Sequence, residues 1–559
     1  MSQWIEVGAA SSLAPGGVVT VKHGAQRIAV FRTADGEVRA TDDRCPHEGY
    51  PLSQGTVAGC VLTCQYHNYK FDLRDGACLM GDEALQVVPV RIEGDRIYVD
   101  PSGPDPAAER PRRWASLDAA LDDDRTAQAS RDTVRLLALG VPLAGVAAHV
   151  AAWEGERAAY GATHALPLSA EALRLAPHLP GLDAAAALLP ALELAGRGSC
   201  RRPPHPRDAA DPGPPAAFAE RLRAAVEPED VPQAVALVRG AVRAGFAPEV
   251  LQEALLRVAS DHLLDYGHGV IYVTKAFDLL GADGVDPDDV EGVLAGLVRE
   301  LATATREDLV PTWAPWRRRV AALGPLPAGG RGAVPDREAA VAALVGATPR
   351  EAVEHVLGWL EAGVAVAALW DVVSLAAAER VLRFDVAHDL DPDLADAWLD
   401  VTHLLTFAAA CRVAWARCPH PELVRLLLQG ARLVARMRPL DGPRPPLDPA
   451  DGDLVAAIRA GDAAQAVRIA AGCDPEAVRW PLGALALDPP GAGLPIFVAH
   501  AVKLSLAGCD EALATGDPRP LAAAVRFLAS PKRERRTPQR VREAVRLVAE
   551  GRPPRTLAV

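Results

Sequence analysis

The chain has 559 residues, of which 50% are hydrophobic, and its formal net charge is −13. This length corresponds to about three or four domains, and the negative charge disfavours nucleic acid as a partner. The nine cysteines lack the regular spacing of a disulfide framework and no signal-peptide pattern follows Met1, so we expect a cytoplasmic protein in a reducing compartment.

The first hundred residues predict a small antiparallel β domain. They contain short β-branched or alternating runs that are typical of strands. These runs are 18–21, 27–33, 38–41, 61–63, 69–73, 87–92 and 96–99. Asp35-Gly36 and Asp75-Gly76 are hairpin-type turns between such runs. Loops on a rigid sheet of this kind often present a metal site.

Two short cysteine–histidine segments lie inside this predicted β domain. Cys45-Pro-His47 and Cys64-Gln-Tyr-His67 are separated by the sixteen residues 48–63. Thiolate and imidazole together are ligands for zinc or iron, so the residue types alone allow either metal. Structural zinc sites more often contain Cys-x2-Cys pairs or two histidines three to five residues apart. One cysteine and one histidine in each segment therefore favours iron.

This pattern resembles that of the Rieske [2Fe–2S] family, in which two cysteines bind one iron and two histidines bind the other. The similarity covers about the first hundred residues. The resemblance implies that Cys45 and Cys64 bind the buried iron. It also implies that His47 and His67 bind the outer iron and face the redox partner.

The respiratory-chain members of that family carry a disulfide between the two ligand loops. The matching positions here are Tyr50 and Tyr66, and Cys60 and Cys78 lie outside the pattern. The resemblance is therefore to the ferredoxin and oxygenase branch, which implies a reduction potential in the lower part of the Rieske range. A zinc ribbon or chance spacing is the alternative interpretation.

The composition changes after this region, where a Pro-rich and Gly-containing segment is followed by sequence rich in Ala, Leu, Arg and Val. Helix-period sequence with proline breaks predicts an all-α domain. We therefore expect a Rieske domain at 1–100, a linker at 101–114 and a large all-α domain at 115–559. The longest apolar run, 136–153, is interrupted by Gly140 and other breaks and predicts a buried helix pair and no membrane span.

A Rieske centre transfers single electrons and performs no substrate chemistry, so an enzyme would need a second site in the helical region. Three segments there offer a histidine beside another polar residue. They are Asp265-Tyr-Gly-His268, Asp400-Val-Thr-His403 and His500-Ala-Val-Lys503. Asp265 and His268 are expected to share a helix face with Tyr272. The glycines beside His268 indicate close approach of a neighbouring helix or of a bound metal and substrate.

Buried polar groups require partners, and these histidines could share one metal ion. Asp265 and Asp400 would then be further ligands or acceptors that orient the imidazoles. The alternative is that each histidine is an ordinary core residue with its own hydrogen bonds.

The same segments resemble the histidine helices of questin-oxidase-like proteins, which are iron-dependent oxygenases that open aromatic polyketide rings. The resemblance implies a mononuclear non-haem iron bound by His268, His403 and His500. It also implies a carbamate on Lys503, since an ammonium group cannot be a ligand.

That family has a further histidine nearer its start. We assign it to His164, with His149 and His262 as alternatives. Where the family has Ile-His, this chain has Ile271-Tyr272.

These features predict an oxidoreductase that receives electrons from a ferredoxin or flavin reductase. The cluster would pass them to the helical-domain iron, which would use O2 to oxygenate or cleave a small apolar or aromatic substrate. Asp265 and Asp400 would orient ligands, and Tyr272 would supply a hydrogen bond or a proton. A homodimer in which one chain's cluster meets its neighbour's iron would also satisfy the need for closely spaced metals.

Two other interpretations stay open. The chain could be a Rieske electron carrier fused to a non-catalytic helical interaction domain. Alternatively, the two Asp-x-x-His pairs could form a dinuclear carboxylate site.

Overall fold

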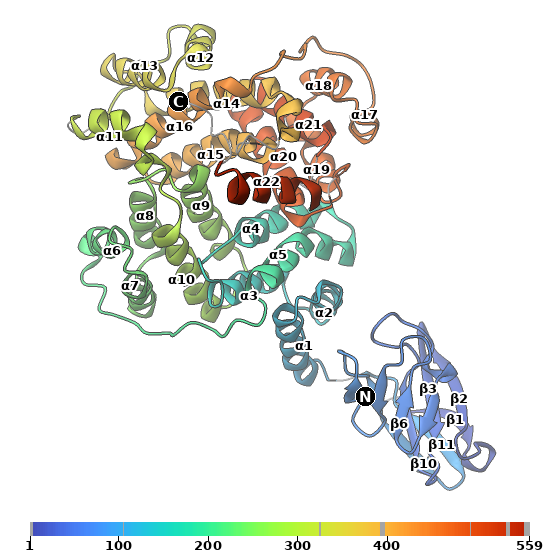
Figure 1. Cartoon of the computed structure of the whole chain (residues 1–559). Coiled ribbons are helices and arrows are strands. Elements are labelled where there is room, and N and C mark those ends of the chain that lie inside the picture. Colours follow the sequence, from blue (N-terminus) through green and yellow to red (C-terminus); the bar gives the residue numbers. More distant parts are fainter. Residues whose placement is uncertain are drawn as a thin grey trace. The chain divides into compact units, whose positions relative to one another are not determined.

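The computed structural model describes residues 4–103, 105–323, 326–391, 397–491, 493–532 and 537–552. The chain forms two compact units (Figure 1). The first comprises Met1–Ala120 and Arg125–Gly140, and the second comprises Leu121–Asp124 and Val141–Val559. An antiparallel β domain is followed by a large helical region, which confirms the fold class expected from the sequence.

The β part of the first unit contains three antiparallel sheets, with strand orders β1-β11-β10, β2-β3-β4-β9 and β5-β6-β7-β8. The first six strands are β1 (Ile5–Ala9), β2 (Val18–His23), β3 (Gln26–Arg32), β4 (Val38–Asp42), β5 (Thr56–Ala58) and β6 (Val61–Thr63). The others are β7 (Lys70–Asp72), β8 (Cys78–Met80), β9 (Val87–Val88), β10 (Val90–Glu93) and β11 (Arg96–Val99).

Strand β3 lies between two hydrophobic clusters because successive side chains of a strand point to opposite faces. Ile28 and Val30 belong to one cluster. Ala29 and Phe31 belong to the other, which also contains the candidate ligands Cys45 and Cys64. The thiols of these two cysteines are therefore part of an apolar core.

Two helices belong to the same unit as the sheets. They are α1 (Pro106–Asp122) and α2 (Thr126–Ala138). Helix α1 begins inside 101–114, which the sequence suggested as a linker. The apolar run 136–153 spans the end of α2 and nearly all of α3, which begins at Leu143. Within the described residues, no helix has the length and hydropathy needed to cross a membrane.

The second unit is built from helices. Its first ten are α3 (Leu143–Gly155), α4 (Ala165–Leu175), α5 (Leu189–Ser199), α6 (Phe218–Val226), α7 (Val231–Arg243), α8 (Pro248–Ala259), α9 (His268–Leu280), α10 (Pro287–Thr303), α11 (Ala314–Ala321) and α12 (Arg337–Gly346). The next five are α13 (Pro349–Glu361), α14 (Val366–Arg383), α15 (Trp398–Arg417), α16 (Arg425–Arg436) and α17 (Leu454–Arg459). The last five are α18 (Ala463–Ala471), α19 (Pro475–Leu485), α20 (Pro495–Thr515), α21 (Arg519–Ala529) and α22 (Thr537–Ala549).

Four of these helices form the centre of the unit, where Figure 1 shows α4, α9, α15 and α20 close together. Helix α4 packs on α9, α9 on α15, α15 on α20 and α20 on α4. Helices α15 and α20 are apolar on most sides, and most of their residues are buried, as expected for helices surrounded by others.

A close crossing of α3 and α10 positions the loop before α4. A Cβ atom at Gly296 would lie 2.4 Å from Cα of Gly155, so the two backbones are in direct contact. The carbonyl of Gly296 accepts the N–H of Ala162 at 2.9 Å. This bond anchors the loop two residues before His164.

We expect Gly296→Ala to lower the stability of the helical unit by about 1–3 kcal/mol, because the added methyl group overpacks this crossing. Gly358→Ala is the control, since nothing lies within 4 Å of a Cβ at this exposed position of α13. There alanine should raise helix stability by about 0.5–1 kcal/mol. Thermal denaturation followed by far-UV circular dichroism measures the stability of both variants. Equal melting temperatures for Gly296→Ala and the parent chain would contradict the role of the crossing.

Candidate metal centres

The two cysteine–histidine segments form loops of the same backbone design. Cys45 N–H bonds to the carbonyl of Tyr50 and Cys64 N–H to that of Tyr69, both at 2.8 Å. Each cysteine carbonyl in turn accepts the N–H four residues later, from Gly49 or Asn68. Those two residues have φ of 76° and 61°, a left-handed conformation that glycine and asparagine tolerate best. The paired loops therefore present equivalent Cys and His side chains.

The side chains of these loops fit a [2Fe–2S] cluster. Cys45 and Cys64 are buried, whereas the side chains of His47 and His67 are 23% and 40% exposed. The imidazole rings lie 4.8 Å apart, and Nδ1 of His47 is buried without a hydrogen-bond partner. Burial and the neighbouring thiol of Cys64 raise the pKa of Cys45 to about 11, so a bound cation would favour the thiolate form of Cys45.

Aromatic stacking joins the two loops at the positions that, in the sequence resemblance, correspond to the disulfide of respiratory-chain Rieske proteins. The rings of Tyr50 and Tyr66 are stacked with centroids 3.8 Å apart. His47 is stacked on Tyr69 from the other loop at 4.5 Å. Each loop thus holds the other without a covalent bond.

In the helical unit, four histidines from different segments come together. His164 is the N-cap residue of α4, His268 is the first residue of α9, and His403 and His500 lie within α15 and α20. Nitrogen atoms of His164, His268 and His403 lie within 4.8 Å of one another. The His500 ring centroid is 4.6 Å from that of His403 and 5.0 Å from that of His164.

Hydrogen bonds fix the tautomers of two of these histidines. Nδ1 of His268 donates to Asp265 at 2.9 Å. Thr402 donates its hydroxyl proton to the Leu399 carbonyl, so its oxygen accepts Nδ1–H of His500 at 2.8 Å. Both rings therefore carry the lone pair on Nε2, the arrangement that a metal ligand requires.

The ring nitrogens converge on one point. Nε2 of His403 lies 2.8 Å from Nε2 of His268, and Nε2 of His164 is buried without a partner. Nδ1 of His164 lies 3.1 Å from the hydroxyl of Tyr272. Burial lowers the pKa of His164, His403 and His500 well below the usual value, so these imidazoles are neutral.

Lys503 lies one helical turn after His500 and is 3% exposed. Among the described residues its Nζ has no hydrogen-bond partner, and burial lowers its pKa to about 7. An amine without partners beside four imidazoles is an unusual feature, because buried polar groups normally form hydrogen bonds.

The local structure around Asp265 corrects one expectation. The sequence suggested a helix on which Asp265 and His268 share a face, but residues Asp265–Gly267 form a 3-10 turn and α9 begins at His268. Gly267 has φ of 94°, and a Cβ there would lie 2.2 Å from the ring of Phe407. Close packing of α15 therefore explains this glycine.

Three other candidates lie elsewhere. The carboxylate of Asp400 accepts the Ala397 N–H at 2.6 Å and caps α15. His149 is 3.5 Å from Asp289, and His262 contacts acidic residues outside the histidine group. Among the histidines considered as the additional ligand, His164 is the one that lies with the other three.

The sequence does not indicate the role of Thr402, because its motif gives no sign that it contacts His500.

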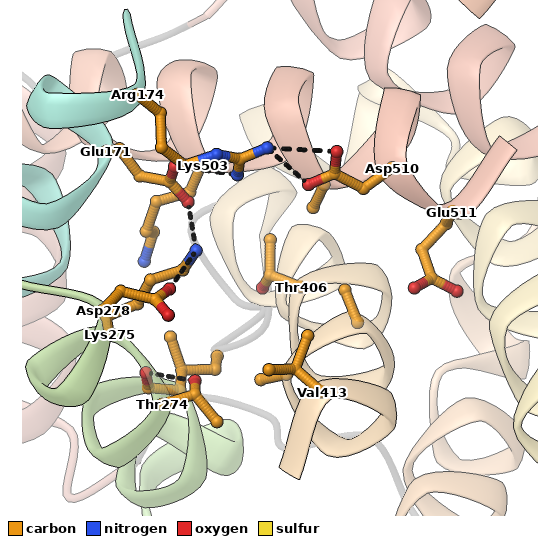
Figure 2. A pocket seen from close by; sticks show the side chains of 14 residues that line it. Glu171, Arg174, Thr274, Lys275, Asp278, Thr406, Val413, Lys503, Asp510 and Glu511 are labelled. Atoms are coloured by element: carbon orange, nitrogen blue, oxygen red, sulfur yellow. Dashed lines mark hydrogen bonds and ion pairs between the residues drawn. The ribbon is translucent and has the colours of Figure 1, made fainter. Parts of the chain in front are cut away.

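A small pocket of about 70 Å³ lies beside Lys503 (Figure 2). Its walls come from the four histidine-bearing helices, and each helix contributes, among other residues, those seven and ten positions after its histidine. These are Glu171 and Arg174, Lys275 and Asp278, Ala410 and Val413, and Ala507 and Asp510. Because the offset is the same in all four, the helices run in one direction from the histidines to the pocket.

Ion pairs across this pocket compensate its charges. Lys275 contacts Glu171 at 2.7 Å and Asp278 at 3.3 Å, and Arg174 contacts Asp510 at 2.8 Å. Figure 2 shows these pairs around the pocket and Lys503 beside them. The pocket therefore offers a small, nearly neutral space next to an amine.

Comparison with known proteins identifies the first unit. Residues 3–90 match the Rieske [2Fe-2S] domain family. The biphenyl dioxygenase ferredoxin subunit of Pseudomonas sp. strain KKS102 is 42% identical over 89 residues, which cover 15% of this chain and 81% of that protein. The chain belongs to the Rieske [2Fe–2S] family. Its Rieske domain transfers electrons, and Cys45, His47, Cys64 and His67 are the residues that fit the cluster.

Two further matches cover the same region. The 4beta-methylsterol monooxygenase of Methylococcus capsulatus is 37% identical over 112 residues, or 18% of this chain, and the chain spans only 30% of that relative. The ferredoxin of carbazole 1,9a-dioxygenase from Nocardioides aromaticivorans IC177 is 26% identical, with 18% of this chain and 100% of that chain covered and a TM-score of 0.17. The two sequence matches relate the Rieske domain to components of a monooxygenase and a dioxygenase, and none of these three proteins covers the helical unit.

We expect Cys45→Ala to abolish the Rieske cluster, because one iron loses half of its protein ligands. Cys60→Ala is the control: Cys60 is also buried in the Rieske domain but lies outside the ligand loops. The Cys45→Ala protein should lose the visible absorbance and the electron paramagnetic resonance (EPR) signal of the reduced cluster, and the Cys60→Ala protein should keep both. A cluster signal in Cys45→Ala would contradict the ligand assignment.

Proposed function

We propose that the chain is an oxygenase whose helical unit binds a mononuclear non-haem iron through His164, His268, His403 and His500. The observation that carries this proposal is the convergence of neutral ring nitrogens beside Lys503, with Nε2 of His164 and Nζ of Lys503 lacking partners. A bound cation would satisfy all of these groups at once. Neutral imidazole suits iron among other transition metals.

Lys503 would complete the site as a carbamate. Its neutral amine would add to CO2, forming an N–C bond and releasing one proton, and the product would offer an anionic oxygen to the metal. Burial favours the neutral amine that this addition needs. The pocket of about 70 Å³ suits CO2 or O2, since benzene occupies cavities of about 150 Å³. We therefore assign the pocket to a small gas and not to the organic substrate.

The bound iron would supply O2 activation, and the protein would control access and protons around it. Asp265 and Thr402 hold two imidazoles in the metal-binding tautomer. When His164 donates Nδ1–H to the Tyr272 oxygen, the proton of that hydroxyl is free to point to a bound substrate. Burial raises the pKa of Tyr272 well above its usual value, which keeps the hydroxyl protonated.

The Rieske domain would deliver the electrons that such chemistry consumes. We propose a ferredoxin or flavin reductase as the external donor and a small apolar or aromatic molecule as the substrate. The relatives named above, which include parts of biphenyl and carbazole dioxygenase systems, support this class of reaction. The competing proposal is an electron carrier with a non-catalytic helical domain, in which the histidines form ordinary core hydrogen bonds.

We expect His403→Ala to remove one iron per chain while the Rieske absorbance stays unchanged, because His403 faces the other ring nitrogens directly. Iron analysis of anaerobically purified protein measures this loss. His355→Ala is the control, since His355 is exposed and stacks on Trp359. If the parent chain contains only the two iron atoms of the cluster, the electron-carrier proposal is favoured.

We also expect Lys503→Ala to lose the helical-unit iron and to recover part of it in the presence of acetate or formate. These small carboxylates would enter the space left by the side chain and replace the carbamate oxygen. Lys532→Ala is the control because Lys532 is a buried lysine that bonds to the Leu528 carbonyl at 2.9 Å. Full iron retention in Lys503→Ala without added carboxylate would exclude lysine from the ligand set.

A further inference from the structure

Helix α2 contacts the cluster loop although it lies outside the region that matches the Rieske family. The family match ends at residue 90, whereas α2 spans Thr126–Ala138 within the same compact unit. Nη2 of Arg135 in this helix donates to the carbonyl of Pro46 at 3.1 Å. Pro46 stands between the cluster ligands Cys45 and His47.

The peptide that accepts this bond also contacts a ligand sulfur. Its carbonyl belongs to Pro46 and its N–H to His47, and that N–H makes a backbone hydrogen bond to Cys45. A hydrogen bond to the carbonyl of a peptide strengthens the N–H of the same peptide as a donor. A continuous path thus runs from the guanidinium through one peptide to the sulfur of Cys45.

Arg135 is held in place by two buried carboxylates. Its Nη1 contacts Glu83 at 2.5 Å and Asp132 at 2.8 Å. Glu83 is 1% exposed in the segment between β8 and β9, and Asp132 is fully buried. Arg131 binds the other carboxylate oxygen of Glu83, Oε1, with two of its nitrogens, one at 2.8 Å. The position of the guanidinium is therefore defined by contacts on three sides.

We propose that Arg135 is a positioning residue for the Rieske cluster, which fixes the Pro46–His47 peptide and raises the reduction potential. Reduction adds one negative charge to the cluster, and a nearby cation stabilises that state. Hydrogen bonds to the cluster sulfurs and local charge are established determinants of such potentials. Glu83 has the opposite electrostatic effect, since its carboxylate offsets the charge of Arg135.

The test is a redox titration of the full-length protein followed by EPR spectroscopy. Arg135→Gln should shift the midpoint potential to a more negative value, and Arg135→Lys should fall between it and the parent. Glu83→Gln should shift the potential to a more positive value, because the cation is then less compensated. These opposite signs distinguish an electrostatic path from simple loosening of the loop, which would move both potentials in the same direction.

Arg44→Gln is the matched control. Arg44 is adjacent to Cys45 in sequence and pairs with Asp42, but its side chain is 62% exposed, so solvent screens its charge. Its potential should change less than that of Arg135→Gln. Equal potentials for Arg135→Gln and the parent would overturn the proposal, as would shifts of the same sign in Arg135→Gln and Glu83→Gln. If Arg135→Gln fails to hold a cluster, a potential of Arg135→Lys at or above that of the parent overturns it.

Discussion

Four buried nitrogen-bearing side chains, His268, His403, His500 and Lys503, together with the partly buried His164, impose the strictest requirement on the helical unit. Neutral imidazoles and an uncharged amine lose hydration when they are buried, and each needs a partner in exchange. Asp265, Thr402 and Tyr272 satisfy one side of three rings. Nε2 of His268 and Nε2 of His403 face each other at 2.8 Å, whereas Nε2 of His164, Nδ1 of His403 and Nζ of Lys503 have no hydrogen-bond partner within the described residues. The arrangement of the helices follows from bringing these groups to one place.

The four helices bring the histidines together because their histidines and pocket residues have the same spacing along each helix. In each of the helices α4, α9, α15 and α20, two pocket residues lie seven and ten positions after the histidine. These offsets place all three side chains on the same face of a helix. The centre of the bundle is consequently layered, with imidazoles in one layer and ion-paired residues such as Glu171 and Lys275 in another. Lys503, three residues after His500, lines the pocket and connects the imidazole layer to it.

The Rieske domain can be recognised from the sequence because each cysteine–histidine pair lies within three or four consecutive residues, so that spacing alone indicates the local geometry. The helical site depends on long-range packing and is less predictable. Asp265 and Asp400 each lie three residues before a histidine, but their roles differ. Asp265 bonds to His268 across a left-handed turn, whereas Asp400 occupies the third position of α15 and caps that helix. His164 has no local signal at all, since the α3–α10 crossing determines its position.

The two centres differ in exposure in the way that the proposed chemistry would require. His67 is 40% exposed, which allows a redox partner to approach the edge of the cluster. His403 and His500 are 4% and 2% exposed, so a reactive centre there would be protected from water and from unproductive reduction. Electron transfer needs an accessible edge and no substrate pocket, whereas oxygen chemistry needs a closed site with a narrow entrance. With both units in one chain, the Rieske domain provides the accessible edge and the helical unit provides the closed site, so neither unit has to meet both requirements.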